Sequence, residues 1–248
     1  ADVIGQPLAY VSEIYQEKLS PYLTGGEQRA EIVIGEGKQA KVFEVTVSPV
    51  SSLYKSQTSL SLDSIITLHD ITQRKEAETA LSRRELIMSA ISLAAEQFLK
   101  ESTWGHNIPR VLEKIGQAAN VSRVYVFMND SDEQGQIFTS QRYEWAAPGV
   151  LPQINNPNLQ RVNFREAGYQ RWEDHLANGE PIYGILSNFP ESEQELLKGQ
   201  DILSMAILPI FVNNLWWGFI GFDECKYERH WTGTELEALH IAASIFGS

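Results

Sequence analysis

Aromatic side chains that recur through the second half of the chain, together with one arginine, are the residues best suited to bind a small molecule. Aromatic walls with a few polar groups line most small-molecule sites. Alternate apolar positions on central strands are also what an ordinary core requires, so an occupied pocket and a plain core both remain open. The candidate ligand-binding set is Tyr125, Phe127, Arg142, Tyr143, Trp145, Trp172, Tyr183 and Trp217.

No set of residues in the sequence predicts a catalytic or metal site. The five histidines are scattered, and no two of them share the i, i+4 spacing of a metal-binding helix face. No nucleophile motif of the Gly-x-Ser-x-Gly type occurs. We therefore expect this chain not to be an enzyme, and the sequence requires no cofactor. The histidines are His69, His106, His175, His230 and His240.

Cys225 is the single cysteine of the chain. One cysteine excludes an internal disulfide and any multi-cysteine metal site, and it fits a reducing cytoplasm. A covalently attached chromophore would need a thiol, so Cys225 is the sole candidate for attachment, and a packed structural cysteine is the simpler interpretation.

Length and charge limit the possible partners. A chain of 248 residues fits two domains better than one. The formal net charge is −12 and no run of Lys or Arg occurs, which argues against nucleic acid or an anionic membrane surface as a partner.

The apolar stretch 205–222 is interrupted by Pro209 and by Asn213-Asn214, so it predicts a hairpin and not a membrane span. We expect a cytoplasmic location, with any membrane anchor of the parent protein outside this chain.

The first 70 residues predict a small antiparallel meander. Helical spacing covers 8–22, and strands are predicted at 30–34, 41–49 and 64–70, with a serine-rich loop at 51–64. The strand 41–49 alternates polar and apolar residues, which predicts one wet face. Three strands bury little core, so this part is expected to be an incomplete unit.

A long helix is predicted from residue 71 to about 99, since this stretch has no Gly or Pro and is rich in helix formers. Its apolar residues follow the 3.5-residue period of a coiled coil, broken at Arg84, which predicts a homodimer through this helix. The apolar stripe widens after Leu86, so the second half is also expected to face a core. Packing only on the following domain is the alternative. The predicted seam is Ala77, Leu81, Met88, Ile91, Ala95 and Phe98.

The sequence after the long helix predicts an antiparallel sheet with helices on both faces, so the fold class is α+β. Helices are expected at 108–116, 166–178, 188–200 and 235–246, the last two opened by capping boxes at Asn188 and Thr232. Strands are expected at 122–129, 136–145 and 181–185. Asn213-Asn214 predicts a two-residue hairpin turn, which would set Ile210 opposite Trp217 and Leu208 opposite Phe219.

Two parts of the chain resemble known families. The stretches 2–8, 43–49 and 69–78, the last containing Asp70-Ile71-Thr72, are similar to the C-terminal half of a PAS domain; the N-terminal strands of that family are absent, so no ligand is assigned there. The stretches 142–145, 171–172 and 215–223, followed by Arg229 and Trp231, resemble a GAF domain of the bacterial signalling type. The resemblance implies a partial PAS domain at 1–70, a signalling helix at 71–99 and a GAF domain at 83–248.

These resemblances imply a cytoplasmic sensory module of a two-component signal-transduction protein. The dimeric helix would relay a signal to an output domain outside this chain, a histidine kinase in the favoured interpretation. The alternative is a small-molecule, cyclic-nucleotide or chromophore-binding GAF sensor of a cyclic di-GMP cyclase or phosphodiesterase. The cyclic-nucleotide signature is half matched, since Phe219, Asp223 and Glu224 fit it but Asn213-Asn214 lacks its lysine. An empty scaffold for dimerisation is a third interpretation.

Overall fold

The computed structural model describes residues 18–19, 28–35, 40–49, 64–100 and 104–247. The chain divides into two compact units, Ala1–Thr79 and Ala80–Ser248, and each is described by itself. Most of the predicted helix at 8–22 and of the predicted loop at 51–64 lies outside the described residues.

The first unit contains an antiparallel sheet of three strands, β1 (Gln28–Ile34), β2 (Lys41–Pro49) and β3 (Ser64–Asp70), in the order β1-β2-β3. Val45 and Val47 on β2 are fully buried against Ile32, Ile34 and Leu19, whereas Glu44 on the other face pairs with Arg29. The predicted strands and the wet face of β2 are therefore confirmed.

The junction between β3 and the long helix is fixed by short-range hydrogen bonds. The backbone amide and hydroxyl of Thr72 both donate to Asp70 Oδ1, at 3.0 and 2.6 Å, and Val42 N donates to Thr72 Oγ1 at 3.0 Å. The hydroxyl and amide of Thr72 lower the pKa of Asp70 to about 2, with help from Lys41. Ile71 between them is buried, so the direction of the helix start is set by the Asp-Ile-Thr sequence.

Helix α2 (Thr72–Lys100) confirms the predicted long helix. Its residues up to Thr79 belong to the first unit and those from Ala80 belong to the second. In the second unit Ile87, Ala90 and Ile91 are buried in one core with α3 (Trp104–Ala119) and α6 (Gly233–Phe246). None of the helices in the described part of the chain combines the length and the apolar character that a membrane span needs.

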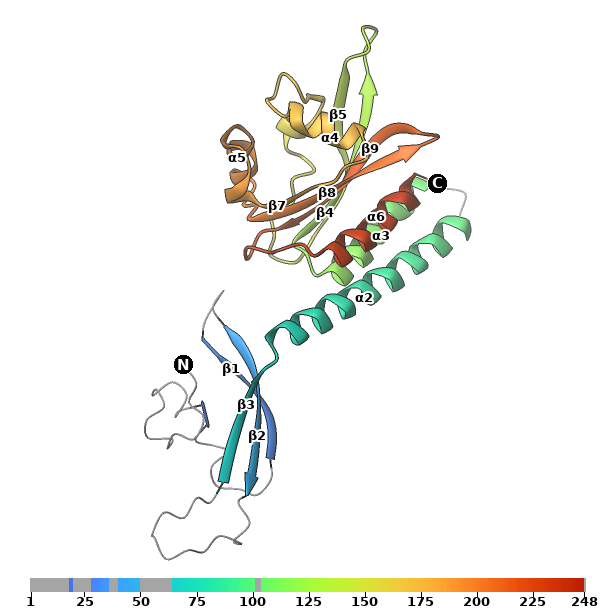
Figure 1. The fold of residues 1–248 in the computed structure, drawn as a ribbon. Helices are drawn as coiled ribbons and strands as arrows, with labels where there is room; N and C mark the ends of the chain where they lie inside the picture. Colours follow the sequence, from blue (N-terminus) through green and yellow to red (C-terminus); the bar gives the residue numbers. More distant parts are fainter. Residues whose placement is uncertain (1–17, 20–27, 36–39, 50–63, 101–103, 248) are drawn as a thin grey trace, which may run out of the picture. The chain divides into compact units, whose positions relative to one another are not determined.

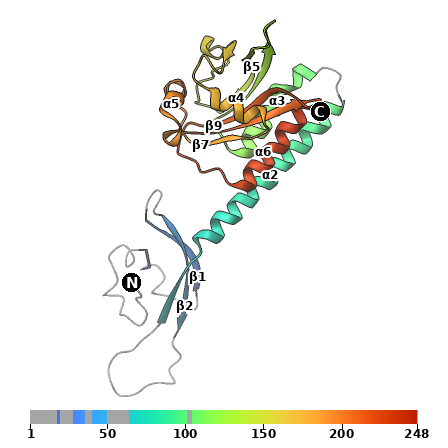
Figure 2. The same cartoon turned by 45° about the horizontal axis from the view of Figure 1, so that its top comes forward.

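The second unit is built on a six-stranded antiparallel sheet in the order β6-β5-β4-β9-β8-β7 (Figure 1). Helices α2, α3 and α6 cover one face, and α4 (Gln170–Ala177) and α5 (Glu191–Lys198) lie over the other (Figures 1 and 2). We call these the helix face and the cavity face. The strands are β4 (Arg123–Ser131), β5 (Ile137–Ala146), β6 (Val162–Asn163), β7 (Ile182–Ile185), β8 (Ser204–Val212) and β9 (Leu215–Glu224), with short 3-10 turns η5 (Pro157–Leu159) and η6 (Leu186–Asn188).

The hairpin between β8 and β9 turns at Asn213-Asn214, as predicted, and both residues have positive φ, 50° and 63°. Its predicted register is wrong beyond the first pairs. Phe211 lies opposite Trp216, but Ile210 lies opposite Gly218 and Leu208 opposite Ile220. A β-bulge inserts Trp217 as an extra residue, and a one-residue shift moves every later side chain to the other face.

The helix boundaries differ from prediction at the N-terminal ends. Helix α3 begins four residues before Ile108, and α4 begins at Gln170 and not at Glu166. The predicted capping box at Asn188 is wrong, because this residue lies in η6 and Pro190 precedes α5 without a side-chain cap. The capping box of Thr232 and Glu235 is confirmed at the start of α6.

Candidate functional site

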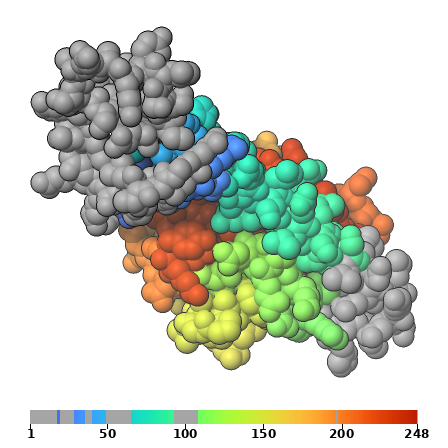
Figure 3. All heavy atoms as spheres, turned by 90° about the horizontal axis from the view of Figure 1, so that it is seen from below, coloured from blue at the N-terminus to red at the C-terminus, as the bar shows by residue number. Residues whose placement is uncertain are grey.

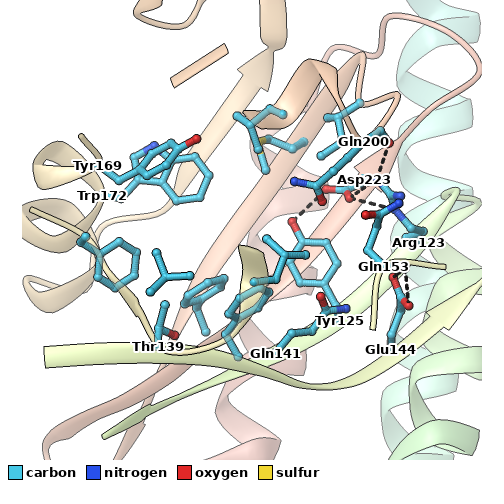
Figure 4. A pocket seen from close by; sticks show the side chains of 18 residues that line it. Arg123, Tyr125, Thr139, Gln141, Glu144, Gln153, Tyr169, Trp172, Gln200 and Asp223 are labelled. Carbon is cyan, nitrogen blue, oxygen red and sulfur yellow. Dashed lines mark hydrogen bonds and ion pairs between the residues drawn. The ribbon is translucent and has the colours of Figure 1, made fainter. Parts of the chain in front are cut away.

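A cavity of about 60 Å³ lies within the second unit, on the cavity face of the sheet (Figure 4). Strands β4, β5, β8 and β9 supply one side of its lining, through residues such as Phe127, Gln141, Met205 and Phe219. The segment from Gln153 to Trp172, which includes η5, β6 and the start of α4, supplies the other side, with further residues from 197–202.

The cavity wall is mainly aromatic. The rings of Phe127 and Phe219 are stacked, with centroids 4.7 Å apart, and the Tyr125 ring meets Phe127 edge-on at 5.6 Å. Tyr169 and Trp172 lie against each other at 5.0 Å on the α4 side. Gly221 is required here, because a Cβ at this position would lie within 2.1 Å of the Tyr125 ring.

A buried ionic network closes one end of the cavity (Figure 4). Arg123 donates to Asp223 at 3.0 Å, and the Tyr125 hydroxyl donates to the same carboxylate at 2.8 Å. Arg123 also donates to the backbone oxygens of Leu151 and Gln200. Burial raises the pKa of Asp223 to about 6, although Arg123 and Tyr125 oppose the rise. At neutral pH the network is therefore charged and internally paired.

Two carboxylates hold the covering segments in place. Glu193 on α5 accepts from Trp172 Nε1 at 2.8 Å and from the Arg171 guanidinium at 2.6 Å, which ties α4 to α5. Glu144 on β5 accepts from the backbone amides of Gln153 and Ile154, each at 2.8 Å, which fixes the loop over the cavity. Each of these acids thus positions a segment of the cavity wall.

The cavity face also carries two polar side chains, Thr139 and Gln141, that lack partners. Both lie on β5 and are 2% and 3% exposed. Within the described part of the chain, Thr139 Oγ1 and both polar atoms of the Gln141 amide have no hydrogen-bond partner. Sequence reasoning missed these residues, because the polar run from Thr139 to Arg142 gives no sign that Thr139 and Gln141 are buried.

Three of the eight predicted ligand-binding residues, Tyr125, Phe127 and Trp172, line the cavity. Another three, Tyr143, Trp145 and Trp217, pack against the helix-face core. Arg142 is exposed, and Tyr183 on the edge strand β7 is 49% exposed. The structure therefore divides the set between two faces and the surface, and a ligand-binding role for any of these residues stays a prediction.

A second β-bulge explains why Tyr143 and Trp145 lie on the helix face. Tyr143 pairs with Val126 but Gln141 pairs with Phe127, so Arg142 is an extra residue on β5. Without it, Tyr143 would have shared a face with Tyr125. Trp145 instead packs over Gly116 of α3, where a Cβ would lie 2.3 Å from the indole ring.

The predicted seam of α2 is also divided. Ala77 and Leu81 are exposed, Met88 is partly buried, and Ile91 is buried in the core of the second unit. The side chains of Ala95 and Phe98 lie outside the described residues. The exposed part of the seam is therefore the first half, where Leu81 is 50% exposed.

A buried carboxylate connects α2 with the other helices on the helix face. Glu235 at the start of α6 accepts from Arg229 at 2.8 Å and from Arg83 of α2 at 3.3 Å. Arg229 also donates to the oxygens of Ala119 and Asn120 at the end of α3. Burial alone would raise the pKa of Glu235, but the Thr232 amide and Arg229 bring it below its ordinary value.

Cys225 is not among the residues that line the cavity. Its backbone amide donates to Ser122 Oγ at 3.0 Å, and burial raises the pKa of the thiol to about 11. The thiol is therefore protonated at neutral pH and is a poor nucleophile.

The four histidines whose side chains the structure describes lie apart from one another. His69, His230 and His240 are exposed, and His175 lies 2.7 Å from Glu180. In the described ranges, no group of three His, Cys, Asp or Glu side chains could hold a metal ion. The side chain of His106 lies outside those ranges.

Comparison with known proteins yields one family. The family described as GAF domain matches residues 108–248, more than half of the chain. The methanogenesis regulatory histidine kinase FilI of Methanothrix harundinacea is 39% identical over 178 residues, which cover 72% of this chain. The chain spans only about a fifth (20%) of the length of that curated relative.

The second unit also resembles solved structures at low sequence identity. The phycocyanobilin-bound GAF domain from a cyanobacterial phytochrome aligns with a TM-score of 0.54 at 15% identity, covering 65% of this chain and 91% of that one. A far-red absorbing dark-state protein with bound biliverdin aligns with a TM-score of 0.53, also at 15% identity, covering 64% and 95%. At this identity the likeness concerns the fold alone.

Proposed function

Because the chain belongs to the GAF domain family, as its match over 108–248 shows, we propose that it is the PAS–GAF sensory part of a longer signal-transduction protein. In this proposal the long helix α2 pairs with its copy in a homodimer. Occupancy of the GAF cavity changes the arrangement of the helix-face helices, and a histidine kinase beyond this chain reads the change.

The relationship to a regulatory histidine kinase supports the output part of the proposal. The 178 aligned residues exceed the 141 residues of 108–248, so the alignment also reaches part of the chain before residue 108. Similarity that extends over both this part and the residues matched by the GAF family is what a shared input module would give. The histidine kinase activity is proposed for the longer protein that contains this chain, and not for the chain itself.

The geometry around β1–β3 supports the PAS part. The meander ends in Asp70-Ile71-Thr72, and its backbone continues directly into α2. Asp70 and Thr72 join the last strand, the neighbouring β2 and the helix start through the bonds described above. A change in this sheet would therefore act on the first turn of α2.

The two ion pairs of Glu235 support a relay of movement between helices. Helices α2 and α6 lie side by side in both views of the ribbon (Figures 1 and 2). Arg83 and Arg229 meet on one carboxylate at the start of α6, so a rotation of α2 and a shift of α6 are coupled through one buried group. Two-state movement of packed helices is a common way of passing signals.

The exposed flank of α2 is the surface proposed for dimerisation (teal in Figure 3). Leu81 is an apolar residue of the seam that remains half-exposed, whereas Ile91 is already used by the core of its own unit. A second copy of α2 would cover Leu81 and Ala77 without disturbing that core.

The experiment that tests dimerisation is Leu81→Asp, with Leu86→Asp as the matched control. Both leucines are half-exposed, 50% and 55%, on the same helix, but only Leu81 lies on the seam. We expect multi-angle light scattering to report a dimer for the parent chain and for L86D and a monomer for L81D. A monomeric parent chain, or equal effects of the two variants, would overturn the proposed helix pairing.

A second candidate function is a ligand sensor whose output is a cyclic di-GMP cyclase or phosphodiesterase. The cavity with unpartnered polar groups favours ligand sensing in either case. A cavity of about 60 Å³ is smaller than the roughly 150 Å³ that accepts benzene. A cyclic nucleotide or a bilin is therefore larger than this space, and Cys225 lies outside its lining.

A further inference from the structure

Three polar atoms that face one small space are the unusual feature of the cavity. Thr139 Oγ1, Gln141 Nε2 and Gln141 Oε1 are buried, line the cavity and have no partner among the described residues. The two side chains come from the same strand and lie along one wall in Figure 4. Buried polar groups in native proteins are normally paired, so three unpaired atoms in one place point to a partner that is not part of the chain.

The charges around these atoms do not favour an ionic partner. Arg123 and Asp223 are paired with each other, so no positive charge is left for an anion. Glu144 keeps its negative charge, and its oxygens accept from the backbone amides of Gln153 and Ile154. The remaining walls are the rings of Phe127, Phe219 and neighbouring aromatics. An anion would lose its hydration without gaining a counter-charge, and a simple cation has no acceptor for the unpartnered Gln141 Nε2, so a neutral ligand fits these walls best.

The hydrogen-bonding character of the three atoms defines the shape of the partner. The Gln141 amide presents a donor and an acceptor side by side, and the Thr139 hydroxyl can act as either. A molecule that satisfies Gln141 must present an acceptor next to a donor. A primary carboxamide has this edge and matches the glutamine amide in two parallel hydrogen bonds.

The volume sets the size of the partner. At about 60 Å³ the cavity is less than half of the roughly 150 Å³ that accepts benzene. A space of this size also holds water, so water molecules are the competing occupants. A ligand of about four to six non-hydrogen atoms is therefore the size that we expect to fill this space.

We propose that the cavity binds a small neutral molecule with an amide-type edge, held by Gln141 and Thr139 and enclosed by Phe127 and Phe219. The inference rests on the proposed function in one respect, that the GAF cavity is the site of input. It adds the chemical class of the ligand and the two residues that select it.

The test uses the whole chain with acetamide as the probe, and with acetone and acetate as matched controls. Acetone keeps the acceptor but lacks the donor, and acetate carries a charge. The readouts are the thermal midpoint and the side-chain amide signal of Gln141 in the NMR spectrum, assigned from its loss in Gln141→Met. We expect acetamide to shift that signal and raise the midpoint at millimolar concentrations, and the two controls to do neither.

Two isosteric variants give the discriminating result. Gln141→Met and Thr139→Val remove the unpartnered atoms with little change in volume, so both variants should fold at least as well as the parent chain. We expect acetamide to bind Gln141→Met about tenfold or more weakly, since two hydrogen bonds are lost, and Thr139→Val several-fold more weakly.

Any of three other results would overturn the proposal. If acetamide changes neither the thermal midpoint nor the Gln141 signal of the unmodified chain while both variants are more stable, water is the only partner of these polar atoms. If acetamide acts equally on the parent and on Gln141→Met, the binding is not at this wall. If benzamide binds better than acetamide, the size limit is wrong. The dimerisation of α2 is measured separately through L81D, so failure here leaves that part of the proposed function intact.

Discussion

Each face of the second unit's sheet buries an arginine–carboxylate pair, and the pKa values of the two acids move in opposite directions. On the helix face Glu235 is paired with Arg229 and capped by Thr232, and its pKa is lowered. On the cavity face Asp223 is paired with Arg123, yet burial raises its pKa to about 6. The difference comes from solvation and capping, because both acids have an arginine within 3.0 Å.

The two faces of the sheet also differ in how their side chains pack. The helix face has fully buried aliphatic residues such as Leu112, Ile115 and Leu208. The cavity face has stacked aromatics and a cavity lined by two side chains with three unpartnered polar atoms, whereas the unpartnered atoms of the helix face, Arg229 Nε and Trp231 Nε1, belong to an arginine and an indole that pack on each other. Close packing contributes most of the stability of a domain, whereas cavities and unmet polar groups cost stability. One face of the sheet is therefore packed for stability, and the other is the face for which we propose binding.

The largest expected effect comes from breaking the pair on the cavity face. Arg123→Met leaves the Asp223 carboxylate buried without its counter-charge and removes the donors to the Leu151 and Gln200 oxygens, so we expect the free energy of unfolding at pH 7 to fall by about 3–5 kcal/mol. Asp130→Asn is the control, because Asp130 pairs with Arg161 at the surface and its loss should change stability by less than about 1 kcal/mol. Urea denaturation measures both. Equal effects of the two variants would show that the buried pair does not stabilise the cavity face.

A slightly smaller effect is expected from a cavity made on the helix face. Leu112→Ala removes a fully buried side chain between α3 and the sheet, which should cost about 3 kcal/mol. Leu215→Ala, at a position 73% exposed on β9, should cost no more than about 0.5 kcal/mol. The thermal midpoint and the urea midpoint report the difference. If Leu112→Ala were nearly neutral, the helix face could not be the stabilising face.

Most elements could be predicted from the sequence because their signals are local. The absence of Gly and Pro together with good helix formers predicts α2, Asn213-Asn214 predicts the turn with positive φ, and Thr232 with Glu235 predicts the capping box of α6. Each of these features depends on residues within a few positions of each other. The boundaries of α4 and α5 were less accurate, since no side chain caps the start of either helix.

The composition of the candidate site could be predicted only in part, because it depends on register. The two extra residues, Arg142 and Trp217, each reverse the faces of the residues that follow, and a bulge has little sequence signature. Gly218 beside Trp217 was an available signal, since a glycine inside a strand often marks a bulge. The pairing of Arg123 with Asp223, 100 residues later, needs the β4–β9 contact and cannot be inferred from spacing.

The smallest effect, and the one that separates the two faces most directly, is the dependence of stability on pH. The pKa of Asp223 is about 6 in the folded chain, above the ordinary value of 3.8, so the folded state takes up a proton between these two pH values and the unfolded state does not. Stability from this group is therefore complete below about pH 3.8 and is lost as the pH rises through 6.

Glu235 has the opposite sign. Because its pKa is lowered from 4.5, its contribution is present above pH 4.5 and is lost only as the pH falls below that value. Between pH 7 and pH 5, Asp223 should therefore add about 1 kcal/mol to the free energy of unfolding as the pH falls, and Glu235 should add nothing.

The two contributions can be separated by variants measured at both pH values. Asp223→Asn should lack the gain between pH 7 and pH 5 that the parent chain shows, whereas Glu235→Gln should keep it, since all other titrating groups are shared. The carboxyl carbon of Asp223, followed by NMR, should titrate near pH 6 in the parent chain. If the gain survives in Asp223→Asn, or if that carbon titrates near pH 4, burial does not dominate the pKa of Asp223, and the two faces do not differ in how they solvate their acids.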